Sequence, residues 1–276
     1  MTLPQIEQQL RAAGIEEARC EARLLASHFT GLSPSRLMAM RGEELPASPA
    51  LADAVRRRTA REPLQYILGE WEFMGLPFTV SPDCLIPRAD TETLVEAAIR
   101  LLPQGAKVAD LCTGSGCIGI SLAHYRPDCA VTAVDISAPA LQIAQKNAAR
   151  LGVTERFRAV LGDVTAADFL PEARFDAVLA NPPYITAEEM LSLEPELSLE
   201  PRIALTDGGD GLSVIRGIFR FAQRALPARG LLLCEIGSGQ GESVTALARA
   251  AGFETEILRD LAGKDRVIKG IKEERL

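Results

Sequence analysis

The stretch Val108-Ala109-Asp110-Leu111-Cys112-Thr113-Gly114-Ser115-Gly116-Cys117-Ile118-Gly119 decides the fold of this chain. Its first four residues predict a short buried strand, and the glycine-rich loop that follows opens a helix running to about Tyr125. From Lys107 onward, strand patterns alternate with helix patterns, which is typical of a parallel sheet covered by helices. We therefore expect an α/β fold.

The rest of this alternation can be read along the chain in the same way. We expect further strands at 130–134, 157–161, 175–180, 230–236, 254–259 and 266–271, and helices at 92–102, 137–150, 211–226 and 240–251. The last two strands follow each other without a helix between them, so they predict an antiparallel edge pair. Residues 186–207, rich in Glu and Pro, predict a long irregular insert.

The motif Asn181-Pro182-Pro183-Tyr184 directly follows the strand expected at 175–180. Two consecutive prolines stiffen the backbone and remove two donors, so the turn presents carbonyl oxygens, one amide side chain and one aromatic ring. In open α/β sheets, ligands bind at the carboxyl ends of the strands. This motif is therefore suited to accept hydrogen bonds from an NH2 group while a ring packs on its planar face.

The glycine loop is compatible with two kinds of cofactor. Gly114-x-Gly116-x-x-Gly119 fits the dinucleotide fingerprint, and Asp135 lies 21 positions after Gly114, near where a carboxylate binds a ribose. The same arrangement serves the adenosine group of S-adenosylmethionine. The loop alone does not choose between NAD and a methyl donor.

Three features outside the loop favour the methyl donor. Asp163, after the third strand, is placed to bind an adenine amino group; Asn181–Tyr184 offers acceptors to a nitrogen nucleophile; and the closing strands predict an antiparallel pair. A dehydrogenase usually places a proton donor near its nicotinamide. No such candidate stands out, since His124 falls inside a predicted helix.

The first 85 residues have a different character. Residues 1–62 predict a small helical domain with helices at about 3–13, 16–29, 34–41 and 49–61, and residues 63–85 predict a β-hairpin linker around Gly75-Leu76. The domain that follows then spans residues 86–276. Arg56-Arg57-Arg58 with Arg61 form a local basic face, which is more typical of a solvated helix side than of a binding surface.

Composition excludes several classes of protein. The 276 residues are 47% hydrophobic and carry a net charge of −7, which does not favour binding to a phosphate backbone. There is no apolar run long enough to span a bilayer and no signal-peptide pattern, so we expect a cytoplasmic protein without membrane contact. Six cysteines without a C-x-x-C pair and only two histidines predict no metal site.

Taken together, these stretches resemble the protein-(glutamine-N5) methyltransferases of peptide chain release factors, the HemK/PrmC family. The resemblance covers nearly the whole chain and rests on the helical N-terminal region, Glu62–Gly69, Leu85–Glu92, the glycine loop, Asn181–Tyr184 and Asp207–Leu212. It implies a seven-stranded, mostly parallel class I methyltransferase fold, with the N-terminal domain docking the release factor. The substrate implied is the glutamine of the Gly-Gly-Gln motif.

The resemblance also implies roles for individual residues. S-adenosylmethionine, converted to S-adenosylhomocysteine, is the expected cofactor; the residues expected to bind it are Cys112, Thr113, Gly114, Ser115, Gly116, Asp135, Asp163, Val164 and Asn181. Asn181, Pro182 and Tyr184 are the expected catalytic residues, and they bind the substrate together with Pro183. Two features depart from the pattern of the family: members often have Gly at the position of Cys112 and Pro at the position of Ala89. Some relatives also carry an aromatic residue where this chain has Val164.

The roles of four other residues and two other functions stay open. Arg88, Asp90 and Glu92 could contact a ligand or could serve as capping and surface charges, and Asp110 could orient the loop or meet the ammonium group of the methyl donor. An adenine-N6 methyltransferase of nucleic acid would use the same Asn-Pro-Pro-Tyr acceptors on a flipped base. A cofactor-binding partner module without catalysis is the remaining alternative.

Overall fold

The computed structural model describes residues 1–40 and 42–274, and the chain divides into two compact units. Unit 1 comprises Met1–Glu70 and Glu194–Leu199, and unit 2 comprises Trp71–Leu193 and Glu200–Leu276. The domain boundaries expected at residues 62 and 85 stay a proposal. The segment 194–199 belongs by its contacts to the helical unit, although the sequence places it in the middle of the insert.

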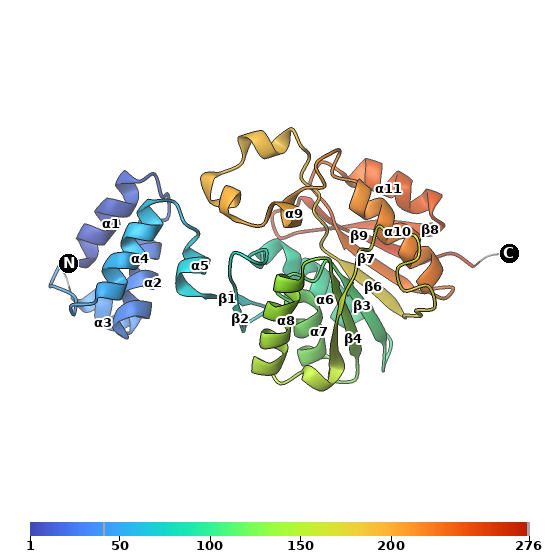
Figure 1. Ribbon diagram of the computed structural model, residues 1–276, viewed down its shortest axis with the longest axis horizontal. Coiled ribbons are helices and arrows are strands. Elements are labelled where there is room, and N and C mark those ends of the chain that lie inside the picture. The colour runs from blue at the N-terminus through green and yellow to red at the C-terminus, as the bar shows by residue number, and fades with distance from the viewer. Residues whose placement is uncertain (41, 275–276) are drawn as a thin grey trace. The chain divides into compact units, whose positions relative to one another are not determined.

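Unit 1 is a bundle of short helices (blue and cyan in Figure 1). They are α1 (Leu3–Ala12), α2 (Ala18–Thr30), α3 (Pro34–Ala39), α4 (Pro49–Thr59) and α5 (Leu64–Leu68). Side chains of Thr2, Ser33 and Ser48 cap α1, α3 and α4, each followed by a proline in the first turn. The first four helices match the expected ones, apart from Arg41, which lies outside the described residues. Helix α5 was missed because its five residues are too few to show a helical period.

Ion pairs of the buried Arg58 and the half-buried Arg61 hold the segment 194–199 within unit 1. Arg58 donates from Nε to Glu21 Oε2 at 2.5 Å and from Nη1 to Glu196 Oε1 at 2.9 Å. Arg61 donates to the other oxygen of Glu196 at 2.7 Å, and Arg57 pairs with Glu62 at 2.5 Å. The arginines of the predicted basic face are thus largely neutralised by glutamates of the same unit.

Unit 2 contains a seven-stranded sheet in the order β5-β4-β3-β6-β7-β9-β8. Its strands are β3 (Lys107–Leu111), β4 (Ala130–Asp135), β5 (Phe157–Leu161), β6 (Ala177–Ala180), β7 (Leu231–Glu235), β8 (Phe253–Arg259) and β9 (Asp265–Lys272). Every neighbouring pair is parallel except β7·β9 and β8·β9. The expected seven-stranded, mostly parallel sheet with an antiparallel edge pair is therefore confirmed.

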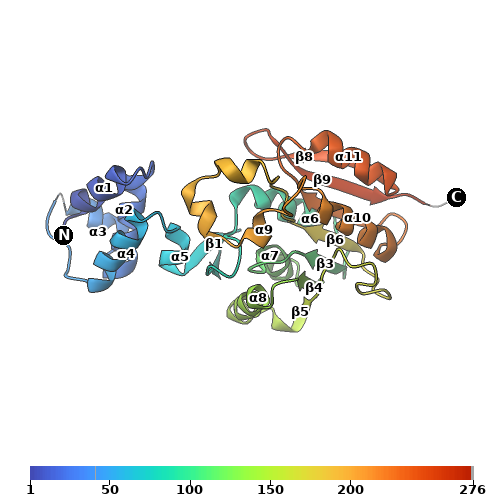
Figure 2. The same cartoon turned by 45° about the horizontal axis from the view of Figure 1, so that its top comes forward.

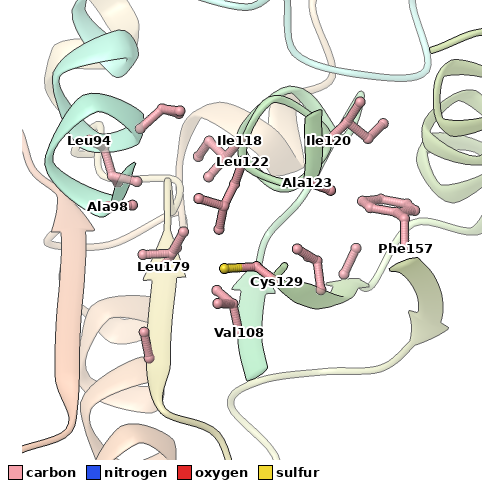
Figure 3. Packing of buried hydrophobic residues seen from close by; sticks show 14 of the residues in the cluster. Leu94, Ala98, Val108, Ile118, Ile120, Leu122, Ala123, Cys129, Phe157 and Leu179 are labelled. Carbon is pink, nitrogen blue, oxygen red and sulfur yellow. The ribbon is translucent and has the colours of Figure 1, made fainter. Parts of the chain in front are cut away.

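Helices cover both faces of this sheet (Figures 1 and 2). One face packs against α6 (Glu92–Leu101), α7 (Cys117–Tyr125) and α8 (Ala138–Arg150), and the other against α10 (Ser213–Ala225) and α11 (Gly241–Ala250). Figure 3 shows the first face, where Leu94 of α6 and Leu122 of α7 lie over Leu179 and Val108 of the sheet. Because both faces are covered, β6 and β7 are buried along their full length, which explains their uninterrupted apolar sequences.

Two smaller features complete unit 2. The hairpin of β1 (Glu70–Phe73) and β2 (Leu76–Thr79) turns at Met74-Gly75, where both residues have positive φ, rather than at the expected Gly75-Leu76. The insert forms only short helices: η3 (Glu189–Ser192) and α9 (Arg202–Leu205) in unit 2, and η4 (Pro195–Leu199) in unit 1. Across residues 1–40 and 42–274, no helix combines the length and apolarity needed to cross a membrane.

We predict that Arg58→Met destabilises the protein by about 3 kcal/mol, because it removes the buried arginine that pairs with Glu21 and leaves Glu196 with Arg61 alone. Arg56→Met is the matched control on the same helix, since Arg56 pairs with Asp53 at the surface, where such pairs contribute about 0–1 kcal/mol. Urea unfolding of both variants measures the difference. Equal losses of unfolding free energy would show that the Arg58 pairs do not stabilise unit 1.

Candidate active site

A cavity in unit 2 opens at the carboxyl ends of the parallel strands. Leu111 of β3 is paired with Val134 of β4 and with Ala180 of β6, so the residues that follow these strands emerge side by side. The expected site residues that line this cavity are Cys112, Gly114, Asp135, Asp163, Val164, Asn181 and Pro183. Thr113, Ser115, Gly116, Pro182 and Tyr184 are not among the lining residues.

The glycine loop turns two of its side chains into the protein. Thr113 donates its hydroxyl to Asp110 Oδ2 at 2.5 Å, and Ser115 is buried, with its carbonyl accepting from Asn147 Nδ2 at 2.9 Å. Gly116 has a φ of 83° and begins α7, and a Cβ there would lie 2.6 Å from Ile120 Cδ1. These residues shape the loop from behind, whereas Cys112 and Gly114 face the cavity.

Asp110 orients the loop and does not line the cavity. Its Oδ2 also accepts from the backbone N–H of Gly119 at 3.0 Å, and a Cβ on Gly119 would lie only 2.8 Å from that oxygen. Burial raises the pKa of Asp110 to about 7, although the hydrogen bonds from Thr113 and Gly119 act to lower it. Of the two roles left open by the sequence, the contacts favour orientation of the loop.

Two aspartates border the cavity. Asp135 accepts from Gly114 N at 2.8 Å through Oδ2 and from Ser137 N at 2.9 Å through Oδ1, and burial raises its pKa. Each oxygen keeps a second acceptor site, so the carboxylate can also accept hydrogen bonds from a ligand's hydroxyl groups. Asp163 accepts from the backbone and hydroxyl of Thr165 through Oδ1, which fixes the loop after β5.

The amide of Asn181 is held from behind. Its Nδ2 donates to Thr91 Oγ1 at 3.2 Å, and Thr91 is buried at the start of α6. Thr91 is the N-cap residue of α6, but its side chain makes no capping hydrogen bond and contacts Asn181 instead. With the nitrogen engaged here, the oxygen of Asn181 is left for the cavity that the residue lines.

Tyr184 is restrained at both ends. Its hydroxyl donates to Glu235 Oε1 at 3.0 Å, and burial together with the Glu235 charge raises the pKa of Tyr184. Its carbonyl accepts from Gln240 Nε2 at 2.9 Å and lies so close to Gly211 that a Cβ there would approach it to 2.2 Å. The expected substrate-facing ring is therefore part of a packed assembly.

The turn that carries Gly211 is itself held by a carboxylate. Asp207 accepts from the backbone N–H groups of Gly209, Gly211 and Ser213 at 2.8, 3.0 and 2.9 Å. Burial acts to raise the pKa of Asp207, but these hydrogen bonds lower it to about 2. The stretch Asp207–Leu212 thus supports Tyr184 and does not line the cavity.

Three charged residues left open by the sequence contact the protein in this structure. Arg88 pairs with the buried Glu200, Asp90 pairs with Arg266 at 2.9 Å, and Glu92 accepts from Met74 N at 2.6 Å. These contacts favour a scaffolding role over ligand binding.

Sequence reasoning missed part of the cavity wall. Further lining residues come from the loop before α6, the start of α8, and the insert; they include Cys84, Leu85, Ile136, Ser137, Pro201, Ile203 and Ala204. Ile136 could have been found, because an apolar residue directly after Asp135 falls in a strand-end loop. The residues of the insert gave no periodic signal.

We predict that Cys112→Gly retains or raises stability. Cys112 has a φ of 59°, a left-handed conformation that costs a residue with a Cβ about 1–2 kcal/mol and glycine nothing. Added entropy of the unfolded chain offsets about 0.5–1 kcal/mol of the gain. Cys117→Gly, inside the first turn of α7, is the control and should lower stability by about 1 kcal/mol. Urea unfolding compares them, and a larger loss for Cys112→Gly would refute the strain argument.

We also predict that Gly211→Ala is much more destabilising than Gly208→Ala. Both glycines have positive φ, 71° and 78°, so the conformational cost of alanine is the same. Only at Gly211 would the new Cβ meet the Tyr184 carbonyl, because nothing lies within 4 Å of a Cβ at Gly208. Unfolding free energies measure the difference. Similar losses for the two variants would mean that the turn shifts to accommodate the new Cβ without displacing Tyr184.

Comparison with known proteins bears on this site. Residues 2–69 match the family model described as PrmC N-terminal domain, and residues 89–234 match the methyltransferase small domain. Among solved structures, a methyltransferase from Pyrococcus furiosus superposes with a TM-score of 0.56 at 16% identity, over 73% of this chain and 91% of that one. That likeness supports the methyltransferase fold.

Sequence similarity is much higher to proteins named release factor glutamine methyltransferase. The one from Moorella thermoacetica is 44% identical over 96% of this chain and 95% of its own length, and the one from Cereibacter sphaeroides is 45% identical over 94% and 93%. A solved protein-(glutamine-N5) methyltransferase (release factor-specific) from Alicyclobacillus acidocaldarius is 34% identical over 71% of this chain and 100% of that one, with a TM-score of 0.42. The chain therefore belongs to the family of the release factor glutamine methyltransferases, as its sequence motifs predicted.

Proposed function

We propose that this chain transfers a methyl group from S-adenosylmethionine to the side-chain amide nitrogen of the glutamine in the Gly-Gly-Gln motif of peptide chain release factors. The observation that carries the proposal is the restrained side-chain amide of Asn181, a residue that lines the cavity. Its Nδ2 donates a hydrogen bond to Thr91 Oγ1 at 3.2 Å. A fixed acceptor at the rim of a cavity is what recognition of an NH2 group requires.

The residues around the cavity fit S-adenosylmethionine. Asp135 would hold the ribose hydroxyls, Cys112 and Gly114 would contact the ligand through a loop without large side chains, and Asp163 with Val164 would face the adenine. Thr113, Ser115 and Gly116 act through the shape of the loop. When bound, S-adenosylmethionine supplies an electrophilic methyl group on a positively charged sulfur.

A glutamine amide nitrogen is a weak nucleophile because its lone pair is delocalised into the carbonyl. The Asn181 side-chain oxygen and the Pro182 carbonyl would accept its two N–H groups and orient the nitrogen. Tyr184 and Pro183 would pack against the amide plane and exclude water. Orientation of this kind can lower a barrier by roughly 7–11 kcal/mol. The nitrogen displaces S-adenosylhomocysteine from the methyl group, and the positively charged N-methyl amide then loses one proton readily, so a strong general base is not needed.

Unit 1 is the proposed docking element for the release factor, in line with its match to the PrmC N-terminal domain. The cytoplasm, where translation terminates, is then the place of action. Methylation of adenine in nucleic acid is disfavoured, because Arg57, Arg58 and Arg61 are paired with glutamates of unit 1 and the net charge is −7.

The function can be tested with purified components. We would incubate the protein and labelled S-adenosylmethionine with a release factor, either wild type or with the glutamine of Gly-Gly-Gln replaced. Label on the wild-type factor alone is the expected result. Label on neither factor, with label entering RNA or DNA, would contradict the proposal.

We predict that Asn181→Ala lowers kcat by roughly 100-fold or more, because misplacement of the reacting nitrogen carries a penalty of that size. Binding of S-adenosylhomocysteine, measured by calorimetry, should change little, since Asp135 and the glycine loop are intact. Near-normal turnover by a folded Asn181→Ala variant would rule out the two-acceptor arrangement.

A further inference from the structure

We propose that Asn147, a fully buried residue of α8 that does not line the cavity, is a positioning residue for the S-adenosylmethionine site. Its side chain fixes the glycine loop relative to the end of the β1–β2 hairpin, and residues of the loop and residues shortly after the hairpin line the cavity. The inference rests on the proposed function in one respect, the identity of the ligand.

The side chain of Asn147 is bound by backbone groups that lie far from it in sequence. Its Oδ1 accepts from Thr79 N at 2.8 Å, and its Nδ2 donates to Thr79 O at 3.0 Å and to Ser115 O at 2.9 Å. Thr79 is 68 positions away and Ser115 is 32 positions away. Arg150 of the same helix adds a longer contact, 3.5 Å from its Nη1 to the Thr79 hydroxyl oxygen.

These partners determine which end of the Asn147 amide is the nitrogen. The Thr79 N–H group needs an acceptor, whereas the carbonyls of Thr79 and Ser115 need donors, and one orientation of the amide satisfies all three. A half-turn about the last bond would place the amide oxygen opposite two carbonyl oxygens and the amide nitrogen opposite an N–H group. The hydrogen bonds therefore specify an asparagine here, and not merely a side chain of this shape.

On one side, Asn147 fixes the peptide unit between Ser115 and Gly116. The Ser115 carbonyl accepts from Asn147, and the Gly116 N–H donates to a carbonyl within the loop at 2.8 Å, so both polar groups of this peptide are engaged. The preceding residue, Gly114, lines the cavity and donates its N–H to Asp135 at 2.8 Å. The loop is thus held from two directions, by α8 and by the carboxylate after β4.

On the other side, Asn147 fixes the point at which the hairpin ends. Thr79 is the last residue of β2, and both of its backbone polar groups are bound by Asn147. The chain then turns, with the Cys84 N–H donating to the Ser81 carbonyl at 3.1 Å, and residues 83–85 line the cavity. Because this connection is short and closed by a hydrogen bond, a shift of Thr79 moves that wall of the cavity.

Helix α8 joins these two contacts to the cavity itself. Ala140 lines the cavity, and Ala144, one turn later, lies so near the loop that a Cβ on Gly116 would approach its Cβ to 3.1 Å. Asn147 follows on the same face, because residues three and four apart in a helix share a face. One helix face thus borders the cavity, packs against the loop and holds the hairpin end, which fixes the binding site before a ligand arrives.

The test compares two variants of Asn147 with a matched control. Asn147→Asp keeps the shape of the side chain but places an oxygen opposite two backbone carbonyls, and Asn147→Ala removes all three hydrogen bonds. Lys272→Met is the control, since Lys272 Nζ also donates to two backbone carbonyls of unit 2, those of Gln223 and Leu226, both at 2.6 Å. Lys272 is the last residue of β9, beside the start of β7, and so lies at the edge of the sheet opposite the cavity.

We expect calorimetry to show that binding of S-adenosylhomocysteine is weakened roughly 10- to 100-fold in both Asn147 variants and is unchanged in Lys272→Met. The KM for S-adenosylmethionine should rise, while the KM for the release factor stays the same, because Asn181 is held by Thr91. General structural damage would raise both KM values. Wild-type affinity for S-adenosylhomocysteine in folded Asn147 variants, or an equal loss in Lys272→Met, would overturn the proposal.

A measurement on the wild type keeps the proposal testable if the Asn147 variants do not fold. If the hydrogen bonds of Asn147 favour ligand binding, ligand binding must favour those hydrogen bonds by the same factor. Hydrogen exchange of the Asn147 side-chain NH2, followed by NMR, should therefore slow when S-adenosylhomocysteine is added. It should slow more than exchange of the Lys272 backbone N–H, which donates to the Gly230 carbonyl at 3.0 Å and reports global unfolding of the same unit.

The same measurement distinguishes failure of this inference from failure of the proposed function. Equal slowing at Asn147 and Lys272 would refute the positioning role, even in a protein that methylates release factors. Greater slowing at Asn147 in a protein that binds S-adenosylhomocysteine but methylates no release factor would refute the proposed transfer and support the positioning role.

Discussion

The parallel pairing of β3 with β4 on one side and β6 on the other is the constraint on which the site depends. Parallel strands end at the same edge of a sheet, so a single register places Cys112, Asp135 and Asn181 around one cavity. Pairing of β6 with β7 extends that edge to Glu235. Residues more than 120 positions apart in sequence therefore belong to one site because of backbone hydrogen bonding, before any side chain makes a contact.

The polar groups of this site are held by the protein as well as offered to ligands. Asp135 accepts hydrogen bonds from two backbone N–H groups, and Asp110 accepts one from the backbone at the end of the glycine loop. Asn181 donates from its side-chain nitrogen to Thr91. Each is thereby fixed before a ligand arrives, which reduces the entropy lost on binding. An amide nitrogen is a weak nucleophile, and preorganised groups that orient it lower the reaction barrier without acid–base catalysis.

Local sequence signals predict some parts of this fold and site, but they do not predict contacts between distant parts of the chain. Strand ends and the residues after them could be predicted, because apolar runs, glycines and the double proline are local signals; Asp135 and Asn181 were found in this way. The positions of Thr113 and Ser115, turned inward behind the loop, depend on the path of the backbone around Asp110. Contacts between Thr91 and Asn181, or Tyr184 and Glu235, join residues 90 and 51 positions apart, and no local pattern encodes them. The segment 194–199 was likewise missed, since its ion pairs lie in another part of the chain.

A crystal structure with S-adenosylhomocysteine and a peptide containing Gly-Gly-Gln would test most directly whether Asn181 is the acceptor for the substrate amide. We predict that the glutamine amide nitrogen donates one hydrogen to Asn181 Oδ1 and the other to the Pro182 carbonyl, with Asn181 Nδ2 still bound to Thr91. A glutamine side chain bound elsewhere, or an Asn181 amide turned with its nitrogen toward the substrate, would contradict it.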